Sequence, residues 1–153
     1  MRTPSKRSPR PRPSLRRAAQ RLVRRGPRVT YAPHRDGRPD PGEVVWAWVP
    51  YEEDASQGKD RPVLLVAADR AHVYGLMLTS QDHDRDAAQE ARAGRHWMDV
   101  GSGGWDREQR PSEVRLDRLL RLDPSAVRRE GAALDRPRFD AVVAAARQFH
   151  ALG

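Results

Sequence analysis

One short polar segment carries several side chains suited to acid–base chemistry. It spans residues 81–86 and reads Gln-Asp-His-Asp-Arg-Asp, which places His83 between two aspartates. Histidine titrates near neutral pH, so His83 could take up and return a proton during catalysis. The alternative is an exposed histidine in a solvated loop. We favour this second interpretation, because loops beside a compact domain are usually exposed.

The same segment raises the question of a metal site, since Asp82, His83, Asp84 and Asp86 follow one another closely. Zinc ligands usually converge from separate elements of a fold, and the chain has no cysteine that could provide a thiolate. A dense run of this kind is more typical of a solvated loop. We therefore predict no metal and no other cofactor.

The tryptophans are a second group with a chemical use. Trp105 follows a glycine-rich stretch and could stack on an unpaired base of single-stranded RNA. It could equally fold back and close one end of a barrel, and the sequence leaves both interpretations open. Trp46 and Trp48 share one face of a predicted strand, which favours a place in the core or in a dimer interface.

Short segments rich in β-branched and aromatic residues must position these groups. Strands are predicted over 44–49, 62–67 and 72–78, and shorter or more polar ones over 97–100 and 113–119. The last of these alternates Val114 and Leu116 with Arg115 and Asp117, as a half-buried strand does. Residues 81–95 are expected to form a loop, with or without a short helix.

A C-terminal helix is predicted from its cap and its apolar stripe. Asp135 is a suitable N-cap and Pro137 suits the first turn. The stripe consists of Phe139, Val142, Val143, Ala146, Phe149 and Leu152. Strands followed by an amphipathic helix predict a small α+β domain over 41–153, in which the helix covers an open part of a β-barrel.

The net charge of +8 on 153 residues is concentrated at the N-terminus. Residues 1–38 hold 13 Lys and Arg against one acid, a balance of +12, whereas residues 39–153 hold 16 against 20, a balance of −4. We expect residues 1–40 to be a disordered basic arm and linker, with room for a short helix at 14–25, that attracts any nucleic acid. The lack of cysteine and of membrane-length apolar runs fits a cytoplasmic protein without a membrane partner.

Three segments, in this order, resemble the PemK/MazF family of toxin–antitoxin ribonucleases. They are residues 41–46, 56–66 and 78–81, and residues 112–123 are a weaker fourth match. The second segment is similar to the family's S-x-Q-G-x-x-R-P loop followed by an aliphatic strand, although here Ser56 and Gln57 are adjacent. The resemblance implies a small SH3-like β-barrel of the PemK/MazF type.

The resemblance also implies an activity, the sequence-specific and metal-independent cleavage of single-stranded RNA by the toxin of a type II pair. The neighbouring 2′-hydroxyl is the nucleophile, so the protein supplies proton transfer and charge stabilisation. The resemblance puts Arg61 and Thr79 at the scissile phosphate, where Arg61 can hold two oxygens in its planar fork and Thr79 can donate its hydroxyl. The RNA-binding positions that it implies are Ser56, Gln57, Lys59, Ser80 and Gln81.

The partners implied are single-stranded RNA, an acidic antitoxin and a second copy of the chain in a homodimer. The competing hypothesis is a catalytically inactive SH3-like barrel that only binds RNA or protein. The presence of both Arg61 and Thr79 favours the enzyme. A third hypothesis is a basic-tailed protein of the nucleoid, in which the arm carries the function.

Overall fold

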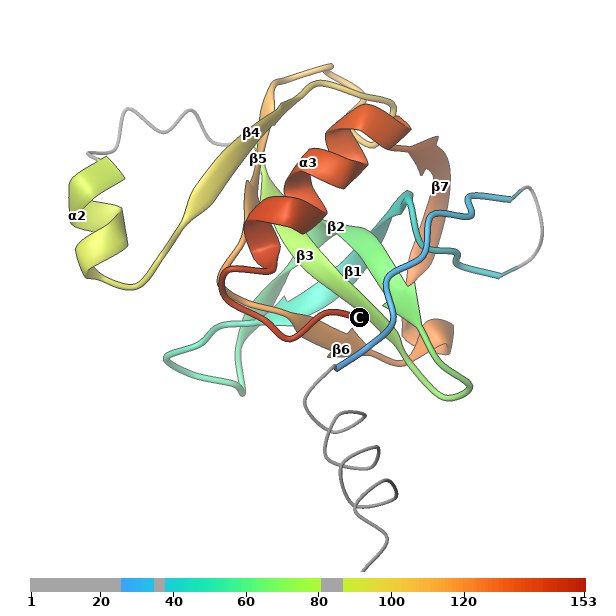
Figure 1. The fold of residues 1–153 in the computed structure, drawn as a ribbon, viewed down its shortest axis with the longest axis horizontal. Helices are drawn as coiled ribbons and strands as arrows, with labels where there is room; N and C mark the ends of the chain where they lie inside the picture. The colour runs from blue at the N-terminus through green and yellow to red at the C-terminus, as the bar shows by residue number, and fades with distance from the viewer. Residues whose placement is uncertain (1–25, 35–37, 81–86) are drawn as a thin grey trace, which may run out of the picture.

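A mostly antiparallel, curled β-sheet forms the body of the protein. The computed structural model describes residues 26–34, 38–80 and 87–153 (Figure 1). The strands are β1 (Glu43–Pro50), β2 (Gly58–Ala68), β3 (Val73–Thr79), β4 (Trp97–Gly101), β5 (Ser112–Arg115), β6 (Leu120–Leu122) and β7 (Arg128–Ala133). The sheet order is β4-β5-β3-β2-β1-β7. Because β5 pairs with one end of β3 and β6 with the other, the sheet curls into a half-barrel.

Helix α3 (Arg136–Ala146) lies across one face of this sheet (Figure 1). Its start is as predicted, since the Asp135 carboxylate accepts a hydrogen bond from the Arg138 amide and a proline occupies the first turn. The helix ends before Phe149, so the last two residues of the predicted stripe lie beyond it. The other helices are α2 (Ala87–Arg92) and the 3-10 helix η1 (Pro124–Ala126). The predicted α+β class, with a barrel-type sheet and a C-terminal helix, is confirmed.

Side chains alternate along the strands, so the sheet has two apolar faces. One face packs against α3 through a cluster that includes Val44, Leu64, Leu76, Val114 and Phe139. The other face carries Val45, Ala47, Val49, Val63, Leu65, Val73 and Met77, with Leu120 of β6 packed on them. This second cluster packs beneath the polar residues of the cleft that is described below. In the described part of the chain, no helix combines the length and the apolar character needed to cross a membrane.

The segment before β1, which the sequence analysis interprets as a linker, is packed on the domain where it is described. Val29 forms an isolated bridge with Ala67 of β2, and the Tyr31 hydroxyl donates to the Leu134 carbonyl at 2.9 Å. The Val29 amide donates to the Gly153 carbonyl at 3.0 Å, and the Gly153 amide donates to Pro27 at 2.9 Å. Residues 26–34 are thus part of the packed structure. The basic arm and its predicted helix at 14–25 lie outside the described residues.

The predicted strands at 44–49, 62–67, 72–78 and 97–100 correspond to β1, β2, β3 and β4. The prediction of one strand over 113–119 is wrong, because β5 ends at Arg115 and β6 begins only at Leu120. Arg115 is also buried, although the alternation places it on the solvent face. Strand β7 is missed by the sequence analysis, since it lacks β-branched residues and is held by its pairing with β1.

Candidate functional site

A cleft of about 250 Å³ opens at one end of the sheet, on the face opposite α3. It is lined by Val49, Pro50, Tyr51, Glu52, Glu53, Arg61, Met77, Thr79, Arg95, Trp97, Arg115 and Arg118. Its lining combines apolar contact surface with four arginines and two glutamates. An anion with an apolar or aromatic portion would suit these walls.

The pairing of β2 with β3 brings Arg61 and Thr79 to the same place. Val63 pairs with Met77 in this antiparallel register, so Arg61 comes opposite Thr79 when the register is extended by two residues. Both side chains line the cleft, with Arg61 half-buried and Thr79 buried. On its other side Thr79 pairs with Glu113 of β5. The sheet itself therefore fixes a hydroxyl opposite a guanidinium at the base of the cleft.

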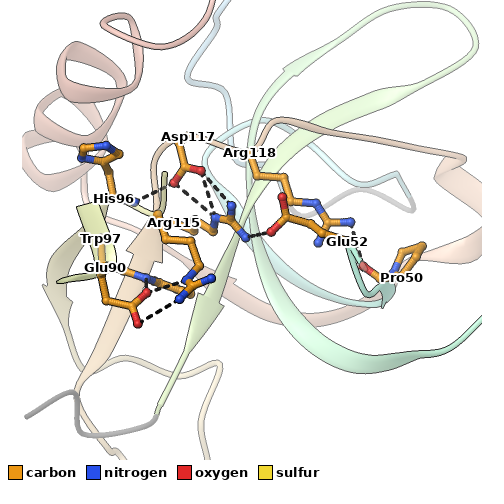
Figure 2. A network of polar contacts seen from close by, with 9 residues as sticks. Pro50, Glu52, Glu90, His96, Trp97, Arg115, Asp117 and Arg118 are labelled. Carbon is orange, nitrogen blue, oxygen red and sulfur yellow. Dashed lines mark hydrogen bonds and ion pairs between the residues drawn. The ribbon is translucent and has the colours of Figure 1, made fainter. Parts of the chain in front are cut away.

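Arg115 is held in the wall of the cleft by two carboxylates (Figure 2). Its Nε and Nη2 donate to Asp117 at 3.2 and 2.8 Å, and its Nη1 donates to Glu52 in the loop after β1. Asp117 also accepts a hydrogen bond from the His96 amide at 2.7 Å. Burial disfavours the charge of Arg115, but the hydrogen bonds to Asp117 and Glu52 outweigh it and raise the pKa of Arg115 above its ordinary value.

Arg118 reaches the same loop from the connection between β5 and β6. Its Nη2 donates to the Pro50 carbonyl at 2.7 Å, as Figure 2 shows. Burial lowers the pKa of Arg118, and the nearby charges of Arg115 and Arg61 lower it further, against the opposing effect of Glu52 and Glu53. A guanidinium still keeps its proton at neutral pH. Arg118 is thus a partly desolvated cation whose charge is incompletely balanced.

Arg95 and Trp97 line the cleft, and both donate a hydrogen bond to the same carboxylate in α2. The Nε of Arg95 donates to the Glu90 carboxylate at 2.6 Å, and the Trp97 indole nitrogen donates to the same carboxylate at 3.4 Å. The hydrogen bond to Glu90 is the main cause that raises the pKa of Arg95. This contact ties α2 to the mouth of the cleft.

The other RNA-binding positions predicted from the sequence are placed less centrally. Ser56 and Gln57 are exposed in the turn between β1 and β2, where the Ser56 hydroxyl donates to Asp54 at 2.6 Å. Lys59 is exposed near the start of β2, and Ser80 is half-buried directly after Thr79. None of these four is among the described residues that line the cleft. Gln81 and His83 lie outside the described residues.

Of the two interpretations of Trp105 left open by the sequence, stacking on RNA is ruled out, because the side chain is buried. It is 2% exposed, packs in the cluster under α3, and donates from its indole nitrogen to the Ser112 hydroxyl at 3.0 Å. Its carbonyl accepts a hydrogen bond from the Trp46 indole at 3.1 Å. The ring lies over Gly103, where a Cβ atom would come within 2.1 Å of it. Trp105 therefore packs inside the domain and does not present a face to RNA.

Glu52, Arg95, Arg115 and Arg118 are lining residues that the sequence analysis does not identify. The alternation places Arg115 on the solvent face of a strand, and Glu52, one of the two carboxylates that hold it, lies 63 residues away in the chain. The only signal in the sequence is the density of arginine over 110–121. Among the described residues there is no group of three or more side chains arranged to hold a metal ion, and residues 82–86 lie outside that set.

The comparison with known families finds a match for most of the chain. Residues 40–150 match a family described as the PemK-like, MazF-like toxin of type II toxin–antitoxin systems. The matched range covers more than two thirds of the sequence and contains every residue that lines the cleft. A comparison with curated proteins finds no match.

Proposed function

We propose that this chain, which belongs to the PemK-like, MazF-like family of type II toxins, cleaves single-stranded RNA in the cleft that contains Arg61 and Thr79. Membership of the family implies the endoribonuclease activity of a type II toxin. One observation supports placing that activity in this cleft. The register of β2 and β3 brings together the two side chains that the chemistry needs, in a cleft that is lined by four arginines.

In the proposed reaction the RNA provides the nucleophile. The 2′-hydroxyl loses its proton and attacks the adjacent phosphorus, the bond to the 5′-oxygen breaks, and that oxygen takes up a proton. The products are a 2′,3′-cyclic phosphate and a 5′-hydroxyl. Because guanidinium does not titrate near neutral pH, Arg61 acts by binding two non-bridging oxygens as negative charge grows on them.

Thr79 has a supporting role in this reaction. Its hydroxyl can donate to a non-bridging oxygen and so fix the phosphate against Arg61. Its buried position at the end of β3 restricts the directions from which a phosphate can approach. His83 lies outside the described residues, so its use in proton transfer stays the less favoured of the two hypotheses for this histidine.

A single 2′-deoxy nucleotide tests this reaction type. An RNA with one mapped cleavage site should be cut by the wild-type protein in EDTA as well as in its absence, because no metal takes part. Replacing the 2′-hydroxyl on the 5′ side of the scissile bond should reduce cleavage there to background, since the nucleophile is missing. Loss of cleavage in EDTA, or a normal cut at the deoxy position, would contradict the proposal. Mapping several RNAs then tests the proposed sequence specificity.

We also propose a homodimer in which Trp48 of β1 lies in the interface. Trp48 is 54% exposed, the largest exposed apolar side chain among the described residues. It lies over Gly58, where a Cβ atom would come within 2.9 Å of the indole, so one side of the ring is packed and the other is uncovered. Exposed aromatic residues of this kind are typical of protein interfaces.

Sedimentation velocity checks the dimer. The wild-type protein should sediment as a dimer at micromolar concentration, and Trp48→Ala should raise the dimer dissociation constant by about tenfold or more. Phe149→Ala is the matched control, because Phe149 is the other large apolar side chain that is exposed in the described residues. A monomeric wild type, or equal effects of the two substitutions, would argue against Trp48 as an interface residue.

The charge of the cleft also supports the proposed partner. Four arginines with two glutamates would attract an acidic segment of an antitoxin as well as RNA. Binding of such a segment over Arg61 would block the phosphate. We propose that both the toxin and this partner act in the cytoplasm.

A further inference from the structure

We propose that Arg115 and Arg118 form a second phosphate-binding subsite, which takes a non-scissile phosphate of the RNA, and that Glu52 occupies this subsite in the free protein. This inference rests on the proposed function, because it assigns further RNA contacts to the same cleft. Its carrying observation is the arrangement of the two arginines around a single short loop, Pro50 to Glu52 (Figure 2).

Arg115 has one fixed partner and one exchangeable partner. Asp117 makes hydrogen bonds to its Nε and Nη2, is 12% exposed, and is itself fixed by the His96 amide. Glu52 contacts the remaining terminal nitrogen, Nη1, and is 48% exposed on a loop. If Glu52 moves away, Asp117 keeps the guanidinium in place and Nη1 is left to donate into the cleft.

Arg118 is held by a neutral group. In the described part of the chain it donates to the Pro50 carbonyl and forms no ion pair with an acidic side chain. The lowered pKa of Arg118 reflects burial and the repulsion of Arg115 and Arg61. An anion placed between Arg115 and Arg118 would relieve this repulsion and satisfy both side chains.

A phosphate is a close chemical substitute for the Glu52 carboxylate. Both present anionic oxygens that a guanidinium fork binds, and a phosphate has enough oxygens for two forks. Both arginines bind the segment Pro50 to Glu52, so a phosphate competes with the contacts that hold this loop against the cleft. Binding of RNA at the subsite would therefore release the loop.

The test measures binding of an RNA that cannot be cleaved. A fluorescent single-stranded RNA with 2′-O-methyl groups throughout is titrated in EDTA at several salt concentrations, and anisotropy gives the dissociation constant. Arg118→Ala should weaken binding about tenfold and reduce the slope of log K against log salt by about one. Arg118→Lys, which keeps the charge but loses the fork, should fall between the wild type and the alanine variant.

Glu52→Gln gives the opposite result if the inference is right. It removes the internal competitor, so binding should become several-fold tighter. Arg121→Ala is the matched control, because Arg121 lies three residues from Arg118, is exposed on β6, and does not line the cleft. Its dissociation constant should stay within twofold of the wild-type value.

The outcomes separate this subsite from the proposed function. If the wild type cleaves RNA but Arg118→Ala binds with unaltered affinity and salt slope, the subsite is wrong and the ribonuclease stands. If the wild type neither binds nor cleaves RNA, both fail. Weaker binding by Glu52→Gln would show that the network is only structural. Variants that alter binding of an acidic peptide such as polyglutamate, but not of RNA, would assign the arginines to a protein partner and overturn the inference.

Discussion

Arg61→Ala is expected to lower the rate of RNA cleavage by roughly a thousandfold or more, which is the range for a cation that stabilises charge on a transferring phosphoryl group. The side chain lines the cleft opposite Thr79 and is only half-buried, so its removal should leave the fold intact. Arg61→Lys keeps the charge but loses the fork, and should retain a small part of the activity. Cleavage of a long unstructured RNA in EDTA measures the rates, and thermal unfolding checks the fold.

A matched control is available on the neighbouring surface. Arg128 of β7 is 60% exposed, pairs with Asp60 of β2 at 3.0 Å, and does not line the cleft. Arg128→Ala removes the same charge and should cut at nearly the wild-type rate. Thr79→Val, which removes only the hydroxyl, should reduce cleavage by about tenfold to a hundredfold. Equal rates for the wild type and Arg61→Ala would show that the reaction takes place elsewhere.

Asp117→Asn is expected to lower the free energy of unfolding by roughly 3 kcal/mol at neutral pH, as for other buried ion pairs that lose one partner. Arg115 is 6% exposed and would keep only Glu52 as a carboxylate partner, which is half-exposed to solvent. The asparagine oxygen can still accept from the His96 amide, but its NH2 group then faces the Arg115 donors, so the substitution removes both the charge and an acceptor. Urea unfolding of the two proteins gives the difference. A change below about 0.5 kcal/mol would mean that Asp117 is not the main counter-charge of Arg115.

The pH dependence gives the same pair a second test. Burial would raise the pKa of Asp117, but the hydrogen bonds from Arg115 and from the His96 amide lower it more, so it lies below the ordinary value of 3.8. A carboxyl whose pKa is lower in the folded state stabilises the fold above its unfolded pKa, and this stabilisation is lost as the pH falls through the folded pKa. The difference between wild type and Asp117→Asn should therefore be constant near neutrality and shrink below about pH 3.8. Asp99→Asn, on the exposed side of β4, is the control for removing one surface carboxylate.

The fold was predictable where local pattern and tertiary environment agree. Runs such as 62–67 are buried on both faces and bounded by turns, and they become central strands. Asp135 and Pro137 mark the start of α3 because a helix end has local requirements. The prediction failed over 113–119, where the chain turns after Arg115 and this charged residue is buried between Asp117 and Glu52, the second of which comes from the distant loop after β1. No local pattern carries that information.

The site was predictable only in part, for a related reason. Arg61 and Thr79 were identified by resemblance, and the register of two neighbouring strands brings them together. Arg115 and Arg118 depend on Pro50 and Glu52, whose position follows from the curl of the whole sheet. Trp105 was left open by its sequence because a tryptophan after glycines can be exposed or buried, and only the Ser112 hydroxyl and Gly103 decide the outcome.

During synthesis on the ribosome, residues 27–29 emerge long before Gly153 is made. In the folded protein these residues are hydrogen-bonded to the Gly153 backbone. Tyr31 is likewise made well before its contact residues Leu134 and Phe139, and β1 is made well before its partner strand β7. On the ribosome, Arg61 and Thr79 can already share a hairpin of β2 and β3 while the sheet face under α3 is still uncovered. The sheet face under α3 is therefore covered only after residues 136–146 have been made, and until then it presents apolar surface of the kind that chaperones bind.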